Sequence, residues 1–186
     1  MTAVKHDLLE DAARVILDAI GEDPYREGLR ETPRRFADWW REFVDYAPGN
    51  VDVTFEVTQV DQMVVVTGMR VWSVCEHHLM PFRCDVTVGY LTGPRVLGLS
   101  KFARIAHKCA HRLQLQERLV NDIADEVCAT SGTQDVAVVG VGEHLCMVMR
   151  GIRTPARMKT SVMRGRFLSK PEVRQEFMAL MGLPDT

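Results

Sequence analysis

The sequence predicts an α+β fold, in which blocks of helices alternate with the strands of an antiparallel sheet. Three observations support this prediction. Apolar residues recur at helical spacing near the N-terminus, in the middle of the chain and near its C-terminus. Val-rich stretches with strand character lie between these helices. The chain shows no internal repeat and no low-complexity linker. This order suits an antiparallel sheet that carries its helices on one side.

Residues 1–50 are predicted to form a helical region that precedes the main domain, 51–186. Apolar residues from Leu8 to Ile20 follow helical spacing, and Gly21 ends the pattern. A second helix is predicted to begin at Thr32, which serves as its N-cap, with Pro33 in the first helical position. Its aromatic face favours packing over ligand binding.

The main domain is predicted to begin with short strands. Met63–Val66 and Arg70–Val74 flank a Thr67-Gly68 turn. Asp85–Tyr90 alternates polar and apolar residues, and Val96-Leu97 is a strand fragment. A loop at Cys75 to Pro81 therefore lies at a strand end, where chemical groups are commonly placed on a rigid scaffold.

Two helices are predicted next, one capped by Ser100 and one over Gln116–Cys128. A strand over Gln134–Arg150 and another over Lys159–Phe167 follow, and Pro171 begins a last helix. Because these helices are placed on one side of the sheet, we expect oligomerisation to cover the other face.

The composition is that of a soluble globular protein, with 186 residues, 46% of them hydrophobic and 26% charged. The net charge of −2 gives no general affinity for nucleic acid or anionic membranes, so any anion site must be a local cluster. No apolar run approaches the ~20 residues of a membrane span. We expect no signal peptide, because the N-terminal stretch carries Asp7, Glu10 and Asp11 and has no apolar region. Five irregularly spaced Cys beside paired His favour a reducing compartment. We therefore expect a cytoplasmic protein.

A zinc site is predicted from Cys75-Glu76-His77-His78 together with His144-Leu145-Cys146. Catalytic zinc takes three protein ligands from Cys and His and leaves a fourth position to water. The Cys-x-x-His spacing lets the side chains of Cys75 and His78, which lie in one turn, reach the same ion. Cys146 is the natural third ligand. His77 and His144 are then left beside the metal to move protons near neutral pH. Alone, Cys146 is equally well explained as a buried core cysteine.

The predicted strand over Gln134–Arg150 gives this site a geometry. Side chains alternate along a strand, so His144, Cys146 and Arg150 are expected to share one face. That face would present a proton-transfer group, a thiolate and a guanidinium in a row.

The predicted helix at Ser100 offers an anion site. A helix N-terminus with a hydroxyl and the nearby Lys101 and Arg104 suits phosphate, although a solvated basic face is the commoner explanation. On the same helix, His107 and His111 stand at i, i+4. No third ligand accompanies them, so a surface or packing role is favoured over a metal clamp.

Taken together, these motifs resemble the GTP cyclohydrolase I family. The resemblance covers the chain from the second helix to Thr160-Ser161, in the family's order and at its separations. It is carried by five segments: Glu31-Thr32-Pro33-Arg34-Arg35, Cys75-Glu76-His77-His78, Gly98-Leu99-Ser100-Lys101, Gln114-Leu115-Gln116-Glu117-Arg118-Leu119, and His144-Leu145-Cys146 running on to Met149-Arg150-Gly151.

The resemblance implies the tunnelling fold for 51–186, the catalytic domain, with sheets joined into a barrel only by oligomerisation. It implies a toroidal homodecamer with active sites at subunit boundaries. It further implies zinc on Cys75, His78 and Cys146. The reaction it implies opens GTP at C8 and gives formate and 7,8-dihydroneopterin triphosphate.

Residue roles follow from the same resemblance. His144 is expected to protonate N7 of the purine, and His77 the ribose ring oxygen. Glu117 is expected to accept hydrogen bonds from guanine N1–H and the 2-amino group. The remaining substrate contacts are assigned to Gln116 and Leu99 and, at the triphosphate, to Ser100, Lys101, Arg104, Arg150 and Arg35.

Two positions depart from the family pattern. Asp38 stands where many members carry a basic residue near the triphosphate, and Leu113 replaces a usual Pro. The alternatives are a tunnelling-fold relative that binds a purine or pterin but catalyses another step, and a non-catalytic or structural zinc protein. The combination of Cys75, His78 and Cys146 speaks against the first, and retention of both His and Glu117 against the second.

Overall fold

The computed structural model describes residues 4–56 and 60–182. The chain divides into two compact units, Met1–Ala47 and Pro48–Thr186. Each unit is described by itself.

The first unit consists of two packed helices, α1 (His6–Ala19) and α2 (Thr32–Val44). They bury Ala13 and Leu17 of α1 against Ala37 and Phe43 of α2. Glu31, not Thr32, occupies the N-cap position of α2, so the predicted cap was wrong by one residue, while Pro33 does lie in the first turn.

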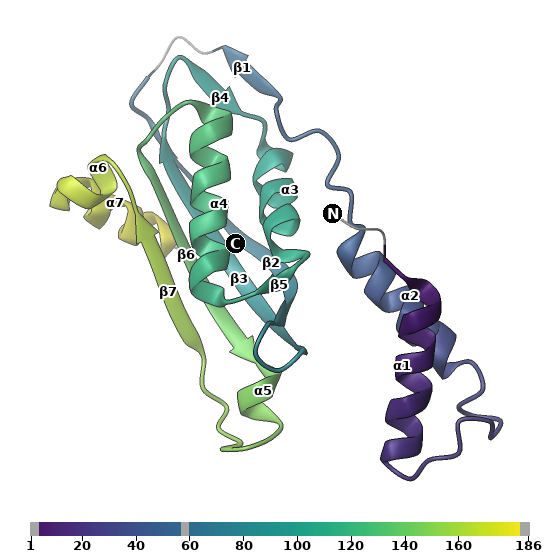
Figure 1. The fold of residues 1–186 in the computed structure, drawn as a ribbon. Coiled ribbons are helices and arrows are strands. Elements are labelled where there is room, and N and C mark those ends of the chain that lie inside the picture. Colours follow the sequence, from purple (N-terminus) through teal and green to yellow (C-terminus); the bar gives the residue numbers. More distant parts are fainter. Residues whose placement is uncertain (1–3, 57–59, 183–186) are drawn as a thin grey trace. The chain divides into compact units, whose positions relative to one another are not determined.

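The second unit is built on a five-stranded sheet with the order β5-β2-β3-β6-β7 (Figure 1). All its neighbours are antiparallel except the short β5, which runs parallel to β2. A separate pair joins β1 to β4. The strands are β1 (Thr54–Glu56), β2 (Met63–Cys75), β3 (Met80–Leu91), β4 (Arg95–Leu97), β5 (Leu113–Gln114), β6 (Val136–His144) and β7 (Met158–Met163).

The two short strands predicted before Cys75 are one long strand, β2. The register to β3 shifts between Val66 and Met69, and Gly68 has a φ of 69°. A glycine in this left-handed conformation is typical of a β-bulge, so the expected Thr67-Gly68 turn only bends the strand.

Helices α3 (Leu99–Ala110) and α4 (Gln116–Ser131) lie side by side across one face of this sheet (Figure 1). Val86, Val88 and Tyr90 point toward them and are at most 1% exposed, which confirms the predicted alternation of β3. Gly98 occupies the N-cap position of α3, so Ser100 lies inside the first turn and is not the predicted cap.

The opposite face is not free of helices, and the prediction of helices on one side only was wrong. Phe167 of α6 (Arg166–Ser169) and Phe177 of α7 (Pro171–Met181) pack with Leu91 and Ala137 as a second, smaller core. Gly89 makes room for them, since a Cβ there would lie 2.6 Å from the Phe177 ring. These helices cover one end of the face, and elsewhere Trp72 is still 52% exposed.

The strand predicted over Gln134–Arg150 ends at His144, and α5 (Leu145–Val148) follows. The pairing with β3 ends where Phe82 lies opposite His144, and the pairing with β7 ends where Met158 lies opposite Gly142. Neither neighbouring strand therefore pairs with the chain beyond His144. The next residue on β3 is Pro81, which has no N–H to donate. The predicted common strand face for His144, Cys146 and Arg150 was therefore wrong. The strand predicted over Lys159–Phe167 likewise stops at Met163.

Candidate active site

The turn between β2 and β3 brings two potential metal ligands together. Cys75 is the last residue of β2, and the amide of Leu79 donates to the Cys75 carbonyl at 2.9 Å. Leu79 adopts a φ of 52°, which is unusual for a residue with a branched side chain. The tight turn sets Cys75 Sγ 3.6 Å from His78 Nδ1.

Cys146 completes a three-residue cluster with Cys75 and His78. The ligand atoms of the three residues all lie within 4.8 Å of one another. Cys146 comes from the first turn of α5, so the turn of a helix, not strand alternation, carries its thiol to the other two. Burial raises the pKa of Cys146, and the neighbouring Cys75 thiol adds to that shift.

A cavity of about 360 Å³ joins this cluster to the predicted catalytic groups. Its walls come from the β2–β3 turn, the start of α4, the end of β6 and the segment before β7. Seven predicted site residues line it: Cys75, His77, His78, Gln116, Glu117, His144 and Cys146.

His144 is held from two sides. Its ring stacks on Phe82, with ring centroids 4.4 Å apart and an interplanar angle of 6°. Its Nε2 lies 3.0 Å from Oε1 of the buried Gln116. Burial lowers the pKa of His144, and the carboxylate of Glu117 acts in the opposite direction.

A network of side-chain hydrogen bonds and ion pairs that local sequence patterns do not predict supports the β2–β3 turn. Arg118 of α4 forms an ion pair with Glu76 and donates through Nε to Gln114 Oε1 at 2.8 Å. The Gln114 amide in turn donates to Asp122 at 2.8 Å. Glu76 and Arg118 are 42 positions apart. No local periodicity signals such a pair, although both residues stand inside the motifs that were singled out.

The predicted triphosphate residues are not part of this cavity. Lys101 donates to the Asn50 carbonyl at 2.7 Å, and Arg104 to the Pro48 carbonyl. Ser100 is exposed near the start of α3, and Leu99 is 73% exposed. Arg150 is exposed just after α5, while Arg35 belongs to α2 in the first unit.

The start of α3 and the metal cluster lie at opposite ends of β3. The Leu97 amide donates to the Tyr90 hydroxyl at 3.2 Å, which places the chain before α3 at the end of β3. His144 pairs with Phe82 at its beginning. Tyr90 and Phe82 are eight positions apart on the strand, a span of roughly 26 Å at ~3.3 Å per residue.

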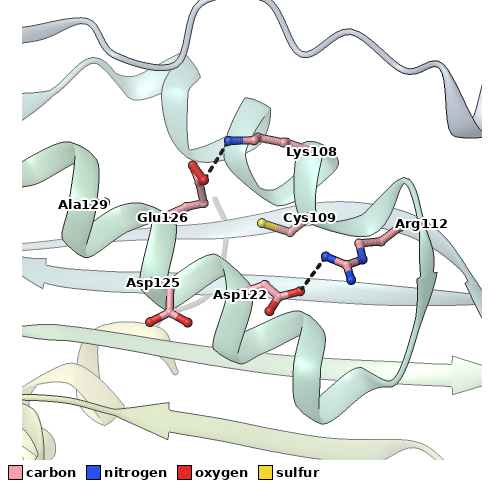
Figure 2. A pocket seen from close by; sticks show the side chains of 7 residues that line it. All are labelled: Lys108, Cys109, Arg112, Asp122, Asp125, Glu126 and Ala129. Carbon is pink, nitrogen blue, oxygen red and sulfur yellow. Dashed lines mark hydrogen bonds and ion pairs between the residues drawn. The ribbon is translucent and has the colours of Figure 1, made fainter. Parts of the chain in front are cut away.

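A second cavity, of about 340 Å³, lies between α3 and α4 (Figure 2). Four of its charged groups are paired with one another, Lys108 with Glu126 at 2.7 Å and Arg112 with Asp122 at 3.8 Å, and Asp125 is paired with Arg164 outside the cavity. Cys109 lies between them, and burial raises its pKa to about 12. None of the predicted site residues lines this cavity.

His107 and His111 do not form a metal site with a third ligand among the described residues. His111 Nδ1 lies 2.7 Å from the carbonyl oxygen of His107 and therefore donates to it. Burial lowers the pKa of His107, with a smaller contribution from His111. Cys84, Cys109 and Cys128 are buried, as predicted.

Comparison with known proteins places this chain in a family. The sequence model of the GTP cyclohydrolase I family matches residues 9–182. The chain is 46% identical over 168 residues to a GTP cyclohydrolase 1 of Hyperthermus butylicus, covering 90% of this chain and 86% of the relative. It is 45% identical to that of a Sulfurihydrogenibium species, with 93% of each chain covered. It is 40% identical to that of Aquifex aeolicus, with 96% and 98% covered.

A solved structure of an archaeosine synthase, QueF-Like, aligns with 53% of this chain at 21% identity and a TM-score of 0.41. That likeness is too slight to decide the fold. In the described part of the chain, no helix has the length and apolar character needed to cross a membrane. The match to the family model and the identity to its members over nine-tenths of the sequence agree with the site that the residues build: the chain belongs to the GTP cyclohydrolase I family.

Proposed function

We propose that this chain hydrolyses GTP at C8 of the purine, giving formate and 7,8-dihydroneopterin triphosphate, with a zinc ion held by Cys75, His78 and Cys146. The observation that carries the proposal is the single cavity that joins these three donors to His77, His144 and Glu117. A cavity with convergent polar groups and a titratable side chain of shifted pKa is typical of an active site.

The donor set fits zinc. Two thiols and one imidazole, with their donor atoms within 4.8 Å of one another, are the soft and borderline ligands that zinc prefers. Three protein ligands are also the number found in catalytic zinc sites, whereas structural sites are closed by a fourth. The chemistry that zinc supplies when bound is a water of lowered pKa, near ~7, as a nucleophile.

The two remaining His move protons. His144 is assigned to protonate N7 of the purine, which makes C8 electrophilic, and His77 to protonate the ribose oxygen as the sugar opens. His77 is exposed, whereas His144 is half-buried against Phe82. The two proposed proton donors therefore differ in their exposure to solvent. A general acid of this kind typically contributes ~10²–10⁴-fold in rate.

Glu117 is assigned to the guanine edge. It lies in the first turn of α4, is exposed and lines the cavity. A carboxylate there accepts from N1–H and the 2-amino group together, and adenine lacks this donor pair. Charge-assisted hydrogen bonds of this type are stronger than neutral ones.

The triphosphate contacts imply a site made by more than one chain. Ser100, Lys101 and Arg104 lie near the end of β3 that is roughly 26 Å from the metal cluster, estimated from strand rise. We infer that these residues, with Leu99, Arg35 and Arg150, complete the sites of a toroidal homodecamer, whose sheets join into a tunnelling-fold barrel. The partly uncovered sheet face around Trp72 is consistent with such packing.

A reducing compartment suits this site. All five cysteines are free, and two of them are the assigned zinc ligands. Thiols of this kind persist in the cytoplasm, where we place the protein.

Anaerobic incubation of the zinc-loaded protein with GTP tests the proposal. We expect formate release together with a pterin absorbance change, both lost in His77→Ala and His144→Ala. If the protein binds zinc and GTP but releases no formate, it is instead a diverged purine- or pterin-binding protein.

A further inference from the structure

Gln116 has an amide group whose orientation is fixed by its neighbours. Its Nε2 lies 3.0 Å from the Met158 carbonyl, 3.2 Å from the Gly140 carbonyl and 3.0 Å from Thr160 Oγ1. Backbone carbonyls only accept hydrogen bonds, so the atom that faces them must be the NH₂ group. The reverse orientation would press the amide oxygen against two carbonyl oxygens.

The oxygen of the Gln116 amide determines which ring nitrogen of His144 carries the hydrogen. Gln116 Oε1 lies 3.0 Å from His144 Nε2. An amide oxygen has no hydrogen to give, so Nε2 must be the donor. In the neutral ring, Nδ1 is then the nitrogen with the free lone pair.

The surrounding sheet is shaped for this contact. A Cβ on Gly142 would lie 1.9 Å from Gln116 Oε1, so a side chain at that position would displace the amide oxygen. Phe82 holds the ring plane by stacking on it. Gln116 itself is 1% exposed, and its amide group is engaged within the protein on both sides.

We propose that Gln116 is a positioning residue that holds His144 in the Nε2–H tautomer, and that Nδ1 is the atom through which His144 exchanges a proton with the substrate. The inference rests on the proposed function and gives Gln116 a role other than the expected substrate contact. A residue that touches a catalytic His and sets its tautomer acts on the chemical step more than on binding.

The tautomer can be read directly by ¹⁵N magic-angle-spinning NMR of the zinc-loaded, full-length protein labelled at His. The signals of His144 are assigned by their loss in His144→Ala. Above the pH at which the ring is neutral, we expect Nε2 to carry the hydrogen and Nδ1 to show the shift of a bare nitrogen. A wild-type ring with hydrogen on Nδ1 would overturn the proposal without any further variant.

Kinetics of Gln116→Met provide the second readout. Loss of the amide oxygen that accepts from His144 should lower kcat about 10–100-fold, while KM for GTP stays within about twofold of the wild-type value. The neutral ring of His144 should then populate both tautomers. Gly142→Ala, which displaces the amide oxygen without removing it, should act in the same direction. A raised KM with unchanged kcat would overturn the proposal in favour of a substrate contact.

Thr92→Val is the control for the loss of a hydrogen bond from a buried side chain elsewhere in the fold. Thr92 is 2% exposed, and its hydroxyl accepts from the Gln62 amide at 3.0 Å near the far end of β3. Thr92→Val removes this one hydrogen bond, whereas Gln116→Met removes the contacts of the amide with Met158, Gly140, Thr160 and His144. The Thr92 variant should change neither kcat nor the tautomer of His144. If the wild type releases no formate, the proposed function fails, whereas the NMR result still decides the tautomer.

Discussion

The guanidinium of Arg118, on α4, is ion-paired with the carboxylate of Glu76, which stands between Cys75 and His77 in the β2–β3 turn. The side chains of both residues are partly buried. Arg118 also donates to the Leu113 carbonyl at 3.1 Å, so one side chain ties the turn to the start of α4. The pair connects the metal cluster to the segment that carries Gln116 and Glu117.

We therefore expect Arg118→Gln to weaken zinc binding. The turn would lose its anchor, and outer-shell changes of this kind typically reduce metal affinity ~10–100-fold. Competition with a chelator measures the change. Arg70→Gln, which removes a more exposed guanidinium of β2 that is paired with Asp85 at 2.7 Å outside this network, is the control. Equal zinc affinity in both variants would contradict the anchoring role.

Thiol alkylation should distinguish Cys146, an assigned zinc ligand, from the buried Cys84 and Cys109. Burial raises the pKa of Cys84 and of Cys109 to about 12, so at pH 8 only about 10⁻⁴ of each is thiolate. In metal-free folded protein we expect iodoacetamide to label Cys146 first, and zinc to suppress that labelling. Mass spectrometry of peptides measures both, and rapid labelling of Cys84 in the folded protein would contradict the assignment.

The raised pKa values of Cys84 and Cys109 also make the free energy of unfolding depend on pH. The thiols of Cys84 and Cys109 have an ordinary pKa of 9.0 that folding raises to about 12. Between these values the folded chain binds more protons than the unfolded chain, so the free energy of unfolding must fall as pH rises. Denaturant unfolding at pH 8 and pH 11 tests this, with Cys84→Ala expected to flatten the slope. An unchanged slope would show that Cys84 does not contribute.

Glu117→Gln should impair recognition of guanine. The amide can no longer accept two hydrogen bonds as a charged group, and we expect kcat/KM for GTP to fall ~10–100-fold, as for a lost charge-assisted pair of about 1.5–3 kcal/mol. Steady-state formate release measures the loss. Asp125→Asn on the same helix, where Asp125 pairs with Arg164, should leave kcat/KM unchanged. An equal loss in both variants would argue against a guanine contact.

Much of the fold follows from local pattern, and the failures have physical causes. Alternation in β3 and helical spacing in α3 and α4 depend on burial against one core, and there the predictions hold. The end of β6 depends instead on where its neighbours stop pairing, which no local window of sequence reveals. The position of α7 across the sheet depends on Gly89 making room for Phe177, a long-range fit.

The metal cluster could be predicted because its residue types and spacing are specific to metal chemistry. The role of Gln116 could not, because it follows from atoms of β6 and β7 that meet its side chain only in the folded chain. The partners of Asp38 could not be predicted from its departure from the family pattern. In the structure, Asp38 interacts with His6, Arg34 and Arg41 within the first unit, and the hydrogen bond with His6 is the main cause that lowers its pKa.

The distance along β3 between the metal cluster and the residues proposed to bind the triphosphate has a genetic consequence. Consider two alleles, one encoding His144→Ala beside the metal cluster and the other encoding Lys101→Ala on α3, near the opposite end of β3. If every site takes its metal end from one chain and its phosphate end from another, random mixed assemblies restore roughly a quarter of the sites. Co-expression of the two inactive proteins should then yield activity that neither has alone, so that recessive defects complement each other within a single gene.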